Sequence, residues 1–165
     1  MTRSRSAVAL GLAAFALGSA AILVPAGLQA AGPHHTIVPA EAIVWGAAPP
    51  SLPSGAQAAA LLGSPAKEGP FVLRLKFPAG FVIPPHTHSK DEFVTVIAGG
   101  FAVAAGETLD AAAKPLPAGS FVHLPAGMPH FARAYGETVV QINGVGPFDV
   151  NYLDPKDDPR RKPTN

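Results

Sequence analysis

The sequence predicts an all-β barrel or sandwich, and three features of the 165-residue chain support this prediction. Apolar runs suited to short strands recur about every ten residues, which is the spacing found in β-sandwiches and barrels. Glycine and proline, with 17 and 19 residues, separate these runs and favour turns. No convincing amphipathic helix and no internal repeat interrupt the pattern, so we expect one domain with one barrel.

The first 30 residues have the features of a secretory signal peptide. Arg3 and Arg5 form a short positive region, residues 7–24 are uncharged and apolar, and small residues surround an expected cleavage site near Ala30 or Ala31. The alternative is an uncleaved membrane anchor, because an apolar stretch of this length can span a bilayer. We expect a periplasmic or secreted protein without stable membrane insertion after cleavage.

Charge and cysteine content exclude several classes of function. Removal of residues 1–30 would leave 10 Lys and Arg residues against 11 Asp and Glu residues, a net charge near −1. A nucleic-acid-binding protein needs a clustered basic face, which this balance does not support. The chain contains no cysteine, so thiol catalysis and thiolate ligands are excluded, and any bound metal must have nitrogen and oxygen ligands.

The predicted elements follow one another closely along the chain. Residues 31–54 are predicted to form a linker, with His34 and His35 in it and a first strand near Ala42–Trp45. Residues 55–153 are predicted to form the barrel, residues 107–113 a short helical turn or a loop, and residues 154–165 a loose polar tail. The other predicted strands are 57–62, 71–77, 81–88, 92–98, 101–105, 121–124, 130–135, 138–143 and 148–152.

Two local patterns make this assignment more specific. Phe71, Leu73, Leu75 and Phe77 alternate with polar or smaller residues, which predicts a strand with one face in the core. The pair Gly99-Gly100 predicts a tight hairpin between the strands before and after it.

Three histidines and one glutamate form the central functional pattern. His86 and His88 alternate on one predicted strand, so their side chains point to the same face. Glu92 begins the next strand, and His130 arrives from a later one. Imidazole and carboxylate ligands suit one divalent transition metal, namely iron, manganese, nickel, copper or zinc. Four such ligands leave coordination positions open, as catalysis requires.

These residues resemble the paired motifs of the cupin superfamily, which includes RmlC-like proteins. The segment from Gly80 to Gly99 matches G-x5-H-x-H-x3-E-x6-G at every defined position. The segment from Gly119 to His130 matches the second motif, G-x5-P-x-G-x2-H-x3-N, except that Ala134 replaces the final Asn. The resemblance implies a double-stranded β-helix, or jelly-roll barrel, of six to eight strands.

The resemblance to cupins also implies which residues bind the metal and how the protein assembles. The implied metal ligands are His86, His88, Glu92 and His130. The implied turn positions are Gly80, Gly99, Gly119 and Gly127. A homodimer is implied by analogy, because cupin sheets often pair.

The wall near the metal is expected to consist of small, apolar residues. Strand parity places Val94, Val96 and Ala98 inward with Glu92, and Ala132 and Ala134 inward with His130. Gln141 and Asn143 are candidates for hydrogen bonds to a ligand, or they satisfy neighbouring loops. His123 is a candidate pocket residue in a role other than metal ligand. Arg74 and Lys76 are expected to be solvated.

Two functions compete at this stage, and a purely structural metal ranks below both. The first is a metal-dependent enzyme, a dioxygenase or isomerase, for which an oxygenase-type reaction on a small oxygen-rich substrate is preferred. Such a reaction needs little beyond the metal and a dry cavity, and Glu92 is the one candidate for a catalytic base. The alternative is a non-catalytic protein that binds metal or a small ligand.

Overall fold

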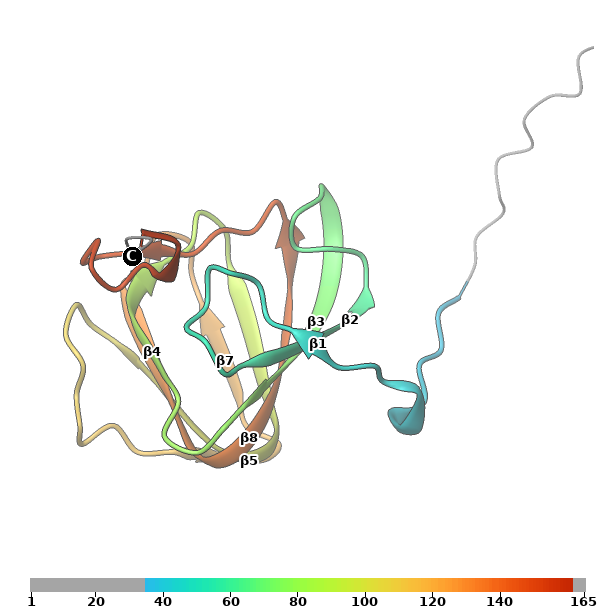
Figure 1. Ribbon diagram of the computed structural model, residues 1–165, viewed down its shortest axis with the longest axis horizontal. Helices are drawn as coiled ribbons and strands as arrows, with labels where there is room; N and C mark the ends of the chain where they lie inside the picture. Colours follow the sequence, from blue (N-terminus) through green and yellow to red (C-terminus); the bar gives the residue numbers. More distant parts are fainter. Residues whose placement is uncertain (1–34, 162–165) are drawn as a thin grey trace, which may run out of the picture. The chain divides into compact units, whose positions relative to one another are not determined.

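The computed structural model describes residues 35–161, and strands dominate this part of the chain (Figure 1). Only two short 3-10 turns, η1 and η2, accompany the strands within residues 35–161. The all-β prediction is therefore confirmed. The elements are η1 (Ala40–Ala42), β1 (Gly46–Ala47), β2 (Gln57–Leu62), β3 (Gly69–Phe77), β4 (Val82–Thr87), β5 (Glu92–Ala105), β6 (Leu116–Pro117), β7 (Phe121–Leu124), β8 (His130–Gly146), β9 (Asn151–Tyr152) and η2 (Pro159–Arg161).

Two long strands, β5 and β8, connect the two halves of an antiparallel jelly roll. The second half of β8 pairs with β3 and with the first half of β5, which also pairs with β7. The first half of β8 pairs with β4 and with the second half of β5, which also pairs with β6. Because each long strand contributes to both halves, the two halves share one interior.

The predicted hairpin at Gly99-Gly100 is wrong, because β5 continues through these residues as one strand. The register between β5 and β8 shifts around Ala98 and Gly100, so the strand bends and does not reverse. Gly99 has φ +78°, and a Cβ there would lie 2.4 Å from the carbonyl oxygen of Glu137. The glycine therefore permits a close crossing of two strands, where the sequence pattern indicated a turn.

β8 also bends at this place. The sequence analysis predicted two strands here, 130–135 and 138–143, whereas the structure has one strand, His130–Gly146. Gly136 has φ +80° and lies opposite the bend in β5. Thr138 is fully buried, and its hydroxyl oxygen lies 3.1 Å from the carbonyl oxygen of Gly100 and 3.2 Å from that of Gly136. A buried hydroxyl thus satisfies backbone carbonyls that the bend takes out of the strand ladder.

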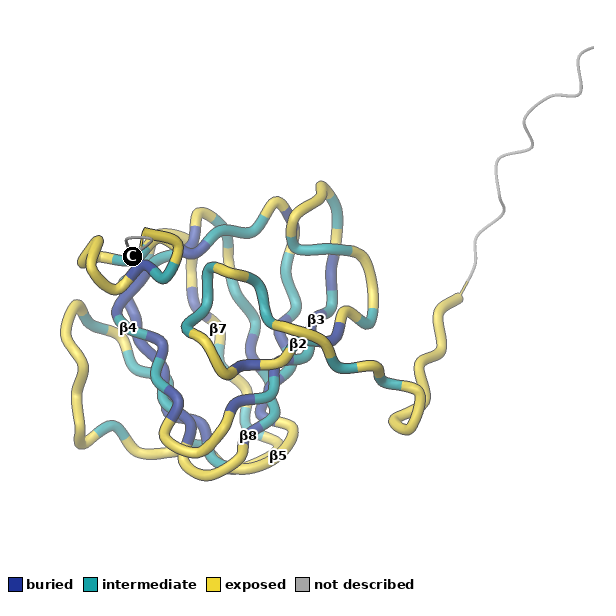
Figure 2. The backbone as a smooth tube through the Cα atoms, viewed as in Figure 1, coloured by how far each residue is buried: buried dark blue, intermediate teal, exposed yellow. Residues whose placement is uncertain are grey.

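Buried and less buried residues alternate along the strands (Figure 2). Phe71, Leu73, Leu75 and Phe77 of β3 are all buried, as their alternation predicts. At one end of the interior, Phe77 stacks on Phe81 and on Phe101, with ring centroids 4.8 Å and 5.5 Å apart. Aromatic rings of this size supply a large part of the apolar burial that stabilises the barrel.

The parity prediction holds on both sides of the bend but fails at the bend itself. Val94, Val96, Ala132 and Ala134 are buried, whereas Ala98 is exposed. The register shift at Ala98 changes which face the following residues occupy, so alternation counted from Glu92 does not extend past Val96.

Smaller differences concern the ends and connections. The first strand is β1 at Gly46–Ala47, and residues 42–45 form no strand because η1 ends among them. The last strand, β9, is shorter than the predicted 148–152, and residues 107–113 form a loop. The two-residue strands β1 and β6 are defined by pairing with β2 and β5. They are too short to show an alternation of apolar and polar residues in the sequence.

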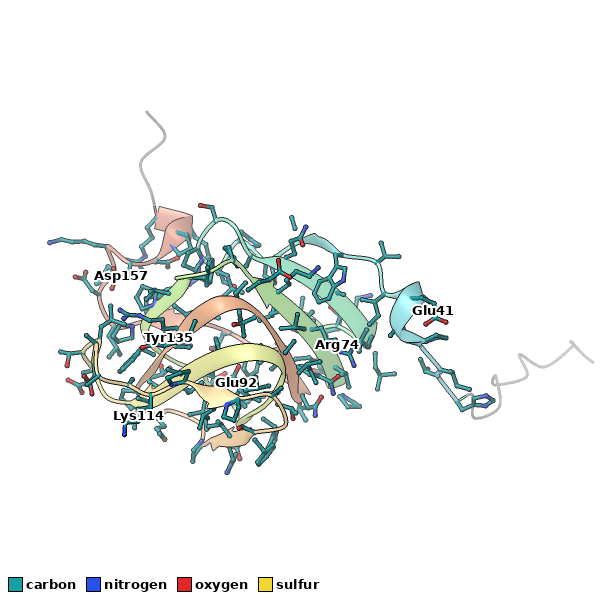
Figure 3. The ribbon with its side chains drawn as sticks, turned by 90° about the horizontal axis from the view of Figure 1, so that it is seen from below. Glu41, Arg74, Glu92, Lys114, Tyr135 and Asp157 are labelled. Carbon is teal, nitrogen blue, oxygen red and sulfur yellow. The ribbon has the colours of Figure 1, made fainter. Side chains whose placement is uncertain are left out.

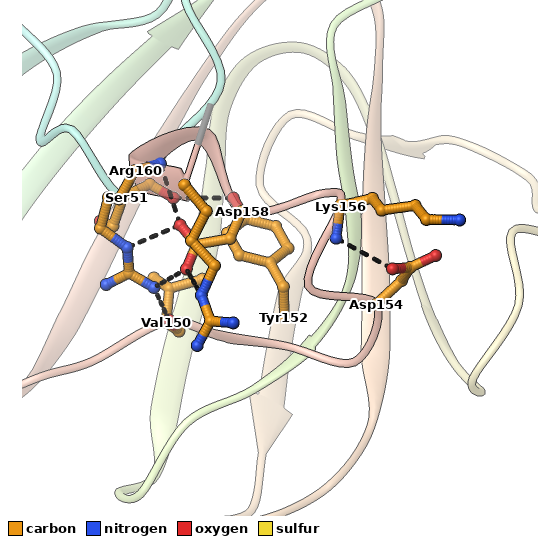
Figure 4. Close-up of polar contacts among 8 residues, drawn as sticks. Ser51, Val150, Tyr152, Asp154, Lys156, Asp158 and Arg160 are labelled. Atoms are coloured by element: carbon orange, nitrogen blue, oxygen red, sulfur yellow. Dashed lines mark hydrogen bonds and ion pairs between the residues drawn. The ribbon is translucent and has the colours of Figure 1, made fainter. Parts of the chain in front are cut away.

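Residues 154–161 are held against the barrel and do not form the loose tail that was predicted (Figure 4). Asp158 is 8% exposed, and its Oδ1 accepts a hydrogen bond from Arg160 Nε at 2.7 Å. Arg160 Nη2 donates to Asp158 Oδ2 and to the carbonyl oxygen of Val150. The hydroxyl of Tyr152 donates to the carbonyl oxygen of Ser51 at 2.7 Å. The charge-assisted pair of Asp158 and Arg160 thus holds the segment in shape, and the bond from Arg160 to Val150 attaches it to the residues before β9.

The predicted signal peptide lies outside the described residues, as does His34. His35 is exposed, in line with a linker. Within residues 35–161, no helix is long and apolar enough to cross a membrane.

The bend at Gly99 can be tested with a matched pair of alanine substitutions. Gly80 and Gly99 have similar φ angles, +75° and +78°, but a Cβ at Gly80 meets nothing within 4 Å. We expect Gly80→Ala to cost about 1–2 kcal/mol of unfolding free energy from backbone strain. Gly99→Ala adds a steric clash and should cost about 3 kcal/mol or more, measured by denaturant unfolding. Equal losses in the two variants would contradict the close crossing.

Candidate metal centre

The three histidines of the sequence pattern meet at one end of the interior. His86 lies on β4 and pairs directly with His130, the first residue of β8. His88 follows β4 by one residue, and its ring centroid lies 4.8 Å from that of His86 and 5.0 Å from that of His130. One ring nitrogen from each histidine lies within 4.8 Å of the others, and all three side chains are buried. The structure therefore forms a group that could hold a metal ion.

Backbone carbonyls set the orientation of each ring. Nδ1 of His86 lies 2.7 Å from the oxygen of Pro84, and Nδ1 of His130 lies 2.9 Å from the oxygen of Met128. Nδ1 of His88 likewise contacts the oxygen of Asp149. Because a carbonyl oxygen only accepts, each Nδ1 must carry the proton and donate it. When a ring is neutral, its unprotonated Nε2 is directed into the site, which is the usual arrangement of metal-binding histidines.

Glu92 supplies a carboxylate beside two of these nitrogens. Its Oε2 lies 3.2 Å from Nε2 of His88 and 3.5 Å from Nε2 of His130. Yet neither of these buried Nε2 atoms has a hydrogen-bond partner. A carboxylate that faces two lone pairs is repelled unless a proton or a cation lies between them. A divalent transition metal would be such a cation. Such metals accept imidazole nitrogens and carboxylate oxygens, which the three histidines and Glu92 supply.

The pKa shifts follow from the same crowding. Burial alone would raise the pKa of Glu92, but its contacts with His130 and His88 outweigh burial and lower that pKa to about 2. Burial, with His130 and His88 nearby, lowers the pKa of His86 to about 3. Burial also opposes protonation of His88, but the Glu92 carboxylate prevails and raises the pKa of His88 above its usual value of 6.5. At neutral pH, Glu92 is therefore ionised and His86 is neutral.

Two aspartates that the sequence analysis missed hold the loop between His88 and Glu92. Asp149 accepts hydrogen bonds from the backbone and hydroxyl of Ser89, besides holding His88 through its own carbonyl. Asp91 accepts from the backbone N–H of Ala126 at 2.9 Å. Neither aspartate is at a spacing that predicts this role, because both contacts join segments far apart in the chain.

Beyond the metal-binding group, the interior contains a cavity of about 200 Å³. Among the described residues that line it, only Ser51, Glu92 and the three histidines have polar side chains. Phe71, Phe77, Phe101 and Phe148 are among the others, so the wall is apolar as predicted but larger than predicted. The ring of Phe148 also stacks on His88, with centroids 4.4 Å apart.

The predicted pocket residues His123, Gln141 and Asn143 are not part of the cavity lining. Val140 and Ile142 face the cavity from β8, so strand alternation directs Gln141 and Asn143 to the outer face. Gln141 accepts a hydrogen bond from Arg74 Nε at 3.1 Å and donates to Asn143.

His123 and the two cations also lie away from the cavity lining. His123 Nε2 lies 2.9 Å from Asp91, and its ring stacks on Phe93. Figure 3 draws Arg74, on β3, apart from Glu92, on β5. Lys76 lies over the ring of Trp45, 4.6 Å from its centroid. The predicted solvated role of Arg74 and Lys76 is therefore only partly right, since both have protein partners.

Solved structures with similar folds support this architecture. The KdgF protein from a Halomonas species is 21% identical, with a TM-score of 0.54 over 68% of this chain and 96% of that chain. An RmlC-like cupin from Ralstonia eutropha is 23% identical, with a TM-score of 0.56 over 76% of each chain. The polyketide cyclase RemF from Streptomyces resistomycificus is 15% identical, with a TM-score of 0.53 over 64% of this chain and 76% of that chain.

These similarities show the cupin fold, and the predicted jelly-roll class is confirmed. No curated protein matches the sequence. A family model does match, over residues 36–165, which includes every strand and the three clustered histidines. The chain, a protein with the cupin fold, therefore belongs to the family described as Domain of unknown function (DUF4437).

Proposed function

We propose that this protein binds one divalent transition metal through His86, His88, His130 and Glu92 and uses it on a small molecule in the adjoining cavity. The main support is the convergence of three histidines, each with Nδ1 at a backbone carbonyl and with its ring buried. Iron, manganese, nickel, copper and zinc all accept this donor set.

The preferred reaction is of the oxygenase type, on a small substrate that bears oxygen ligands. A bound metal would supply Lewis-acid or redox chemistry. The chain itself supplies an apolar cavity that excludes water and holds the substrate near the histidines. Glu92 is ionised at neutral pH, so its carboxylate can also accept a proton from a substrate hydroxyl that reaches it. An oxygenase needs few further groups, which matches the sparse polar lining.

A second candidate is a non-catalytic protein that binds the metal or a small ligand. The observation that favours it is the same sparse lining, since Glu92 and the histidines are the titratable groups among the described cavity residues. Hydrolases and isomerases commonly place a separate acid or base near the substrate. A purely structural metal ranks lower, because the barrel already has a continuous apolar core.

Location and assembly remain part of the proposal. The charged start and apolar stretch of residues 1–30 support export and cleavage, with the protein acting in the periplasm or outside the cell. The sequence-based boundaries are retained as proposed limits: a linker with the first strand over 31–54, a barrel over 55–153 and a polar tail over 154–165. A homodimer is proposed by analogy with cupin sheets, and the exposed Phe121 and Ile97 are apolar residues available for such a contact.

Loss of one histidine should abolish tight metal binding. We expect His86→Ala to weaken the affinity for Zn²⁺ or Mn²⁺ by roughly 100-fold or more, because it removes a buried ligand. Isothermal titration calorimetry of the purified protein measures this change. His123→Ala is the matched control, since His123 is 43% exposed in its side chain and lies outside the cavity lining. Similar affinities in both variants would contradict the proposed ligand set.

Oxygen uptake separates the two candidate functions. Metal analysis of the protein purified from its native compartment should find one equivalent of a transition metal. Oxygen consumption is then measured with a panel of catechols, diketones and small acids. Turnover that is lost in His86→Ala supports the enzyme, whereas metal-dependent ligand binding without turnover supports the binding protein. A protein that holds no metal and melts identically after chelation would contradict both functions.

The raised pKa of His88 predicts opposite pH trends for the stability of the metal-free protein and for the extra stability that bound metal adds. A group with a raised folded pKa contributes stability below its unfolded pKa and loses it as pH rises through the folded value. The metal-free protein should therefore lose stability above pH 6.5 as His88 releases its proton. His86 is neutral in the folded protein there, and above about pH 7.5, where the unfolded chain has also lost this proton, it adds no pH dependence. Metal competes with the His88 proton, so metal binding should strengthen over the same range. Thermal melts at several pH values measure both trends: the melting temperature without metal should fall, and the increase caused by Zn²⁺ should grow. A Zn²⁺-induced increase that stays constant while the metal-free protein loses stability would contradict this account.

A further inference from the structure

The polar and apolar parts of the cavity are sharply separated. Its polar side chains are the metal-binding group at one end and Ser51 at the loop of residues 49–52. Beyond the histidines, the wall continues through Ile83, Ala132 and Val103, which neighbour one another across β4, β8 and β5. The stacked rings of Phe77 and Phe101 then complete the wall. A ligand that reaches the metal-binding group must therefore place the rest of its body against hydrocarbon.

The cations of the sheet cannot serve such a ligand. Arg74 is bonded to Gln141 on the outer face, and Lys76 lies over Trp45. Among the described lining residues no Lys or Arg is present. A second carboxylate or phosphate on the ligand would be buried without a partner, which is strongly unfavourable. The same holds, more weakly, for a body rich in hydroxyl groups, because each hydroxyl would lose its hydrogen bonds to water.

The volume of the cavity limits the size of that body. Engineered apolar cavities of about 150 Å³ bind benzene. The cavity here measures about 200 Å³, which accommodates one ring or a short branched chain with a small polar group. Pro49, Leu52 and Pro65 extend the apolar wall onto two loops. These loops are attached by the Tyr152 hydroxyl, which donates to Ser51, and by the backbone N–H of Phe148, which donates to Pro65.

We infer that the ligand of this site is a small amphiphile with one metal-chelating oxygen group at one end and an uncharged, apolar body of about one ring. This inference rests on the proposed metal site and makes its substrate class more specific. It confines the oxygen atoms of the expected substrate to one end of the molecule. Sugar acids and dicarboxylates are then poor ligands, because their second polar end has no partner in the cavity.

Three hydroxamates that share one chelating group test the inference on the Zn²⁺-loaded full chain, in which a redox-inert metal prevents oxidation. Acetohydroxamate provides the chelating group alone, benzohydroxamate adds an apolar ring, and 4-carboxybenzohydroxamate adds a charge to that ring. Calorimetry should show benzohydroxamate binding at least about tenfold more tightly than acetohydroxamate, from burial of the ring. The charged ring should bind about tenfold or more weakly than the uncharged ring. Equal affinities, or a preference for the charged ring, would overturn the inference.

A lysine introduced into the cavity wall provides a second, independent test of where the ligand body lies. Leu52 lies on a loop, is partly buried against the core and lines the cavity. In Leu52→Lys the hydrocarbon stem of the lysine can keep this packing, which a thermal melt checks, and its charge should shift the preference toward 4-carboxybenzohydroxamate by about tenfold. Val44→Lys adds the same charge at a residue that is 84% exposed and outside the lining, and should leave the ranking unchanged. The same shift in both variants, or none in Leu52→Lys, would contradict the proposed position of the ligand body.

Failure of the proposed function can be distinguished from failure of this inference. If Zn²⁺ binds but the ranking of the hydroxamates is absent, the metal site stands and the ligand class is wrong. If Zn²⁺ does not bind, the proposed function fails, and the metal-free protein is titrated with benzene and with succinate by NMR. Benzene binding without succinate binding would still support an apolar ligand body, and the reverse would overturn it.

Discussion

The pairing of β5 with β8 is the constraint on which the rest of the structure depends. These two strands run side by side across both halves of the barrel, and every other strand except β1, β2 and β9 pairs with one of them. The pairing survives the change of direction because Gly99 and Gly136 occupy positive φ angles where the two strands bend. The buried hydroxyl of Thr138 lies beside the carbonyl oxygens of Gly100 and Gly136 there. Because both strands bend here, the two halves of the barrel face one shared interior.

The metal-binding group is a consequence of the same topology. His130 begins β8 and Glu92 begins β5, and because the two strands are antiparallel these residues lie at opposite ends of the shared ladder. The bend near Gly99 and Gly136 brings the two halves together, so that Glu92 Oε2 lies 3.5 Å from Nε2 of His130. β4 then places His86 opposite His130, and the carbonyl of Asp149 orients His88. Each imidazole is held by a backbone carbonyl and not by a mobile side chain, which fixes the direction of Nε2 at little entropic cost. His86 and His130 lie on strands, whereas His88 lies in the loop after β4 and is held there by the carbonyl of Asp149.

Local patterns predicted a large part of this arrangement. The alternation of Phe71, Leu73, Leu75 and Phe77 predicted the strand and its buried face, because burial of one face imposes a period of two. The spacing of His86, His88, Glu92 and His130 predicted that these residues meet. The hairpin predicted at Gly99-Gly100 was wrong, because glycine is favoured at a strand bend with a positive φ angle as well as in a hairpin turn. Gln141 and Asn143 alternate with the buried Val140 and Ile142, so the same period of two places them on the outer face, and their prediction as pocket residues did not use this alternation.

The sequence by itself determined the all-β class, the identity of the clustered histidines and the nitrogen and oxygen character of any metal site. These properties depend on residue type and on spacing within short segments, which the order of residues contains directly. Only the tertiary structure decided the bend at Gly99, the roles of Asp91 and Asp149, the attachment of residues 154–161 and the apolar length of the cavity. Each of these depends on contacts between segments far apart in the chain, and no local period or spacing encodes such contacts.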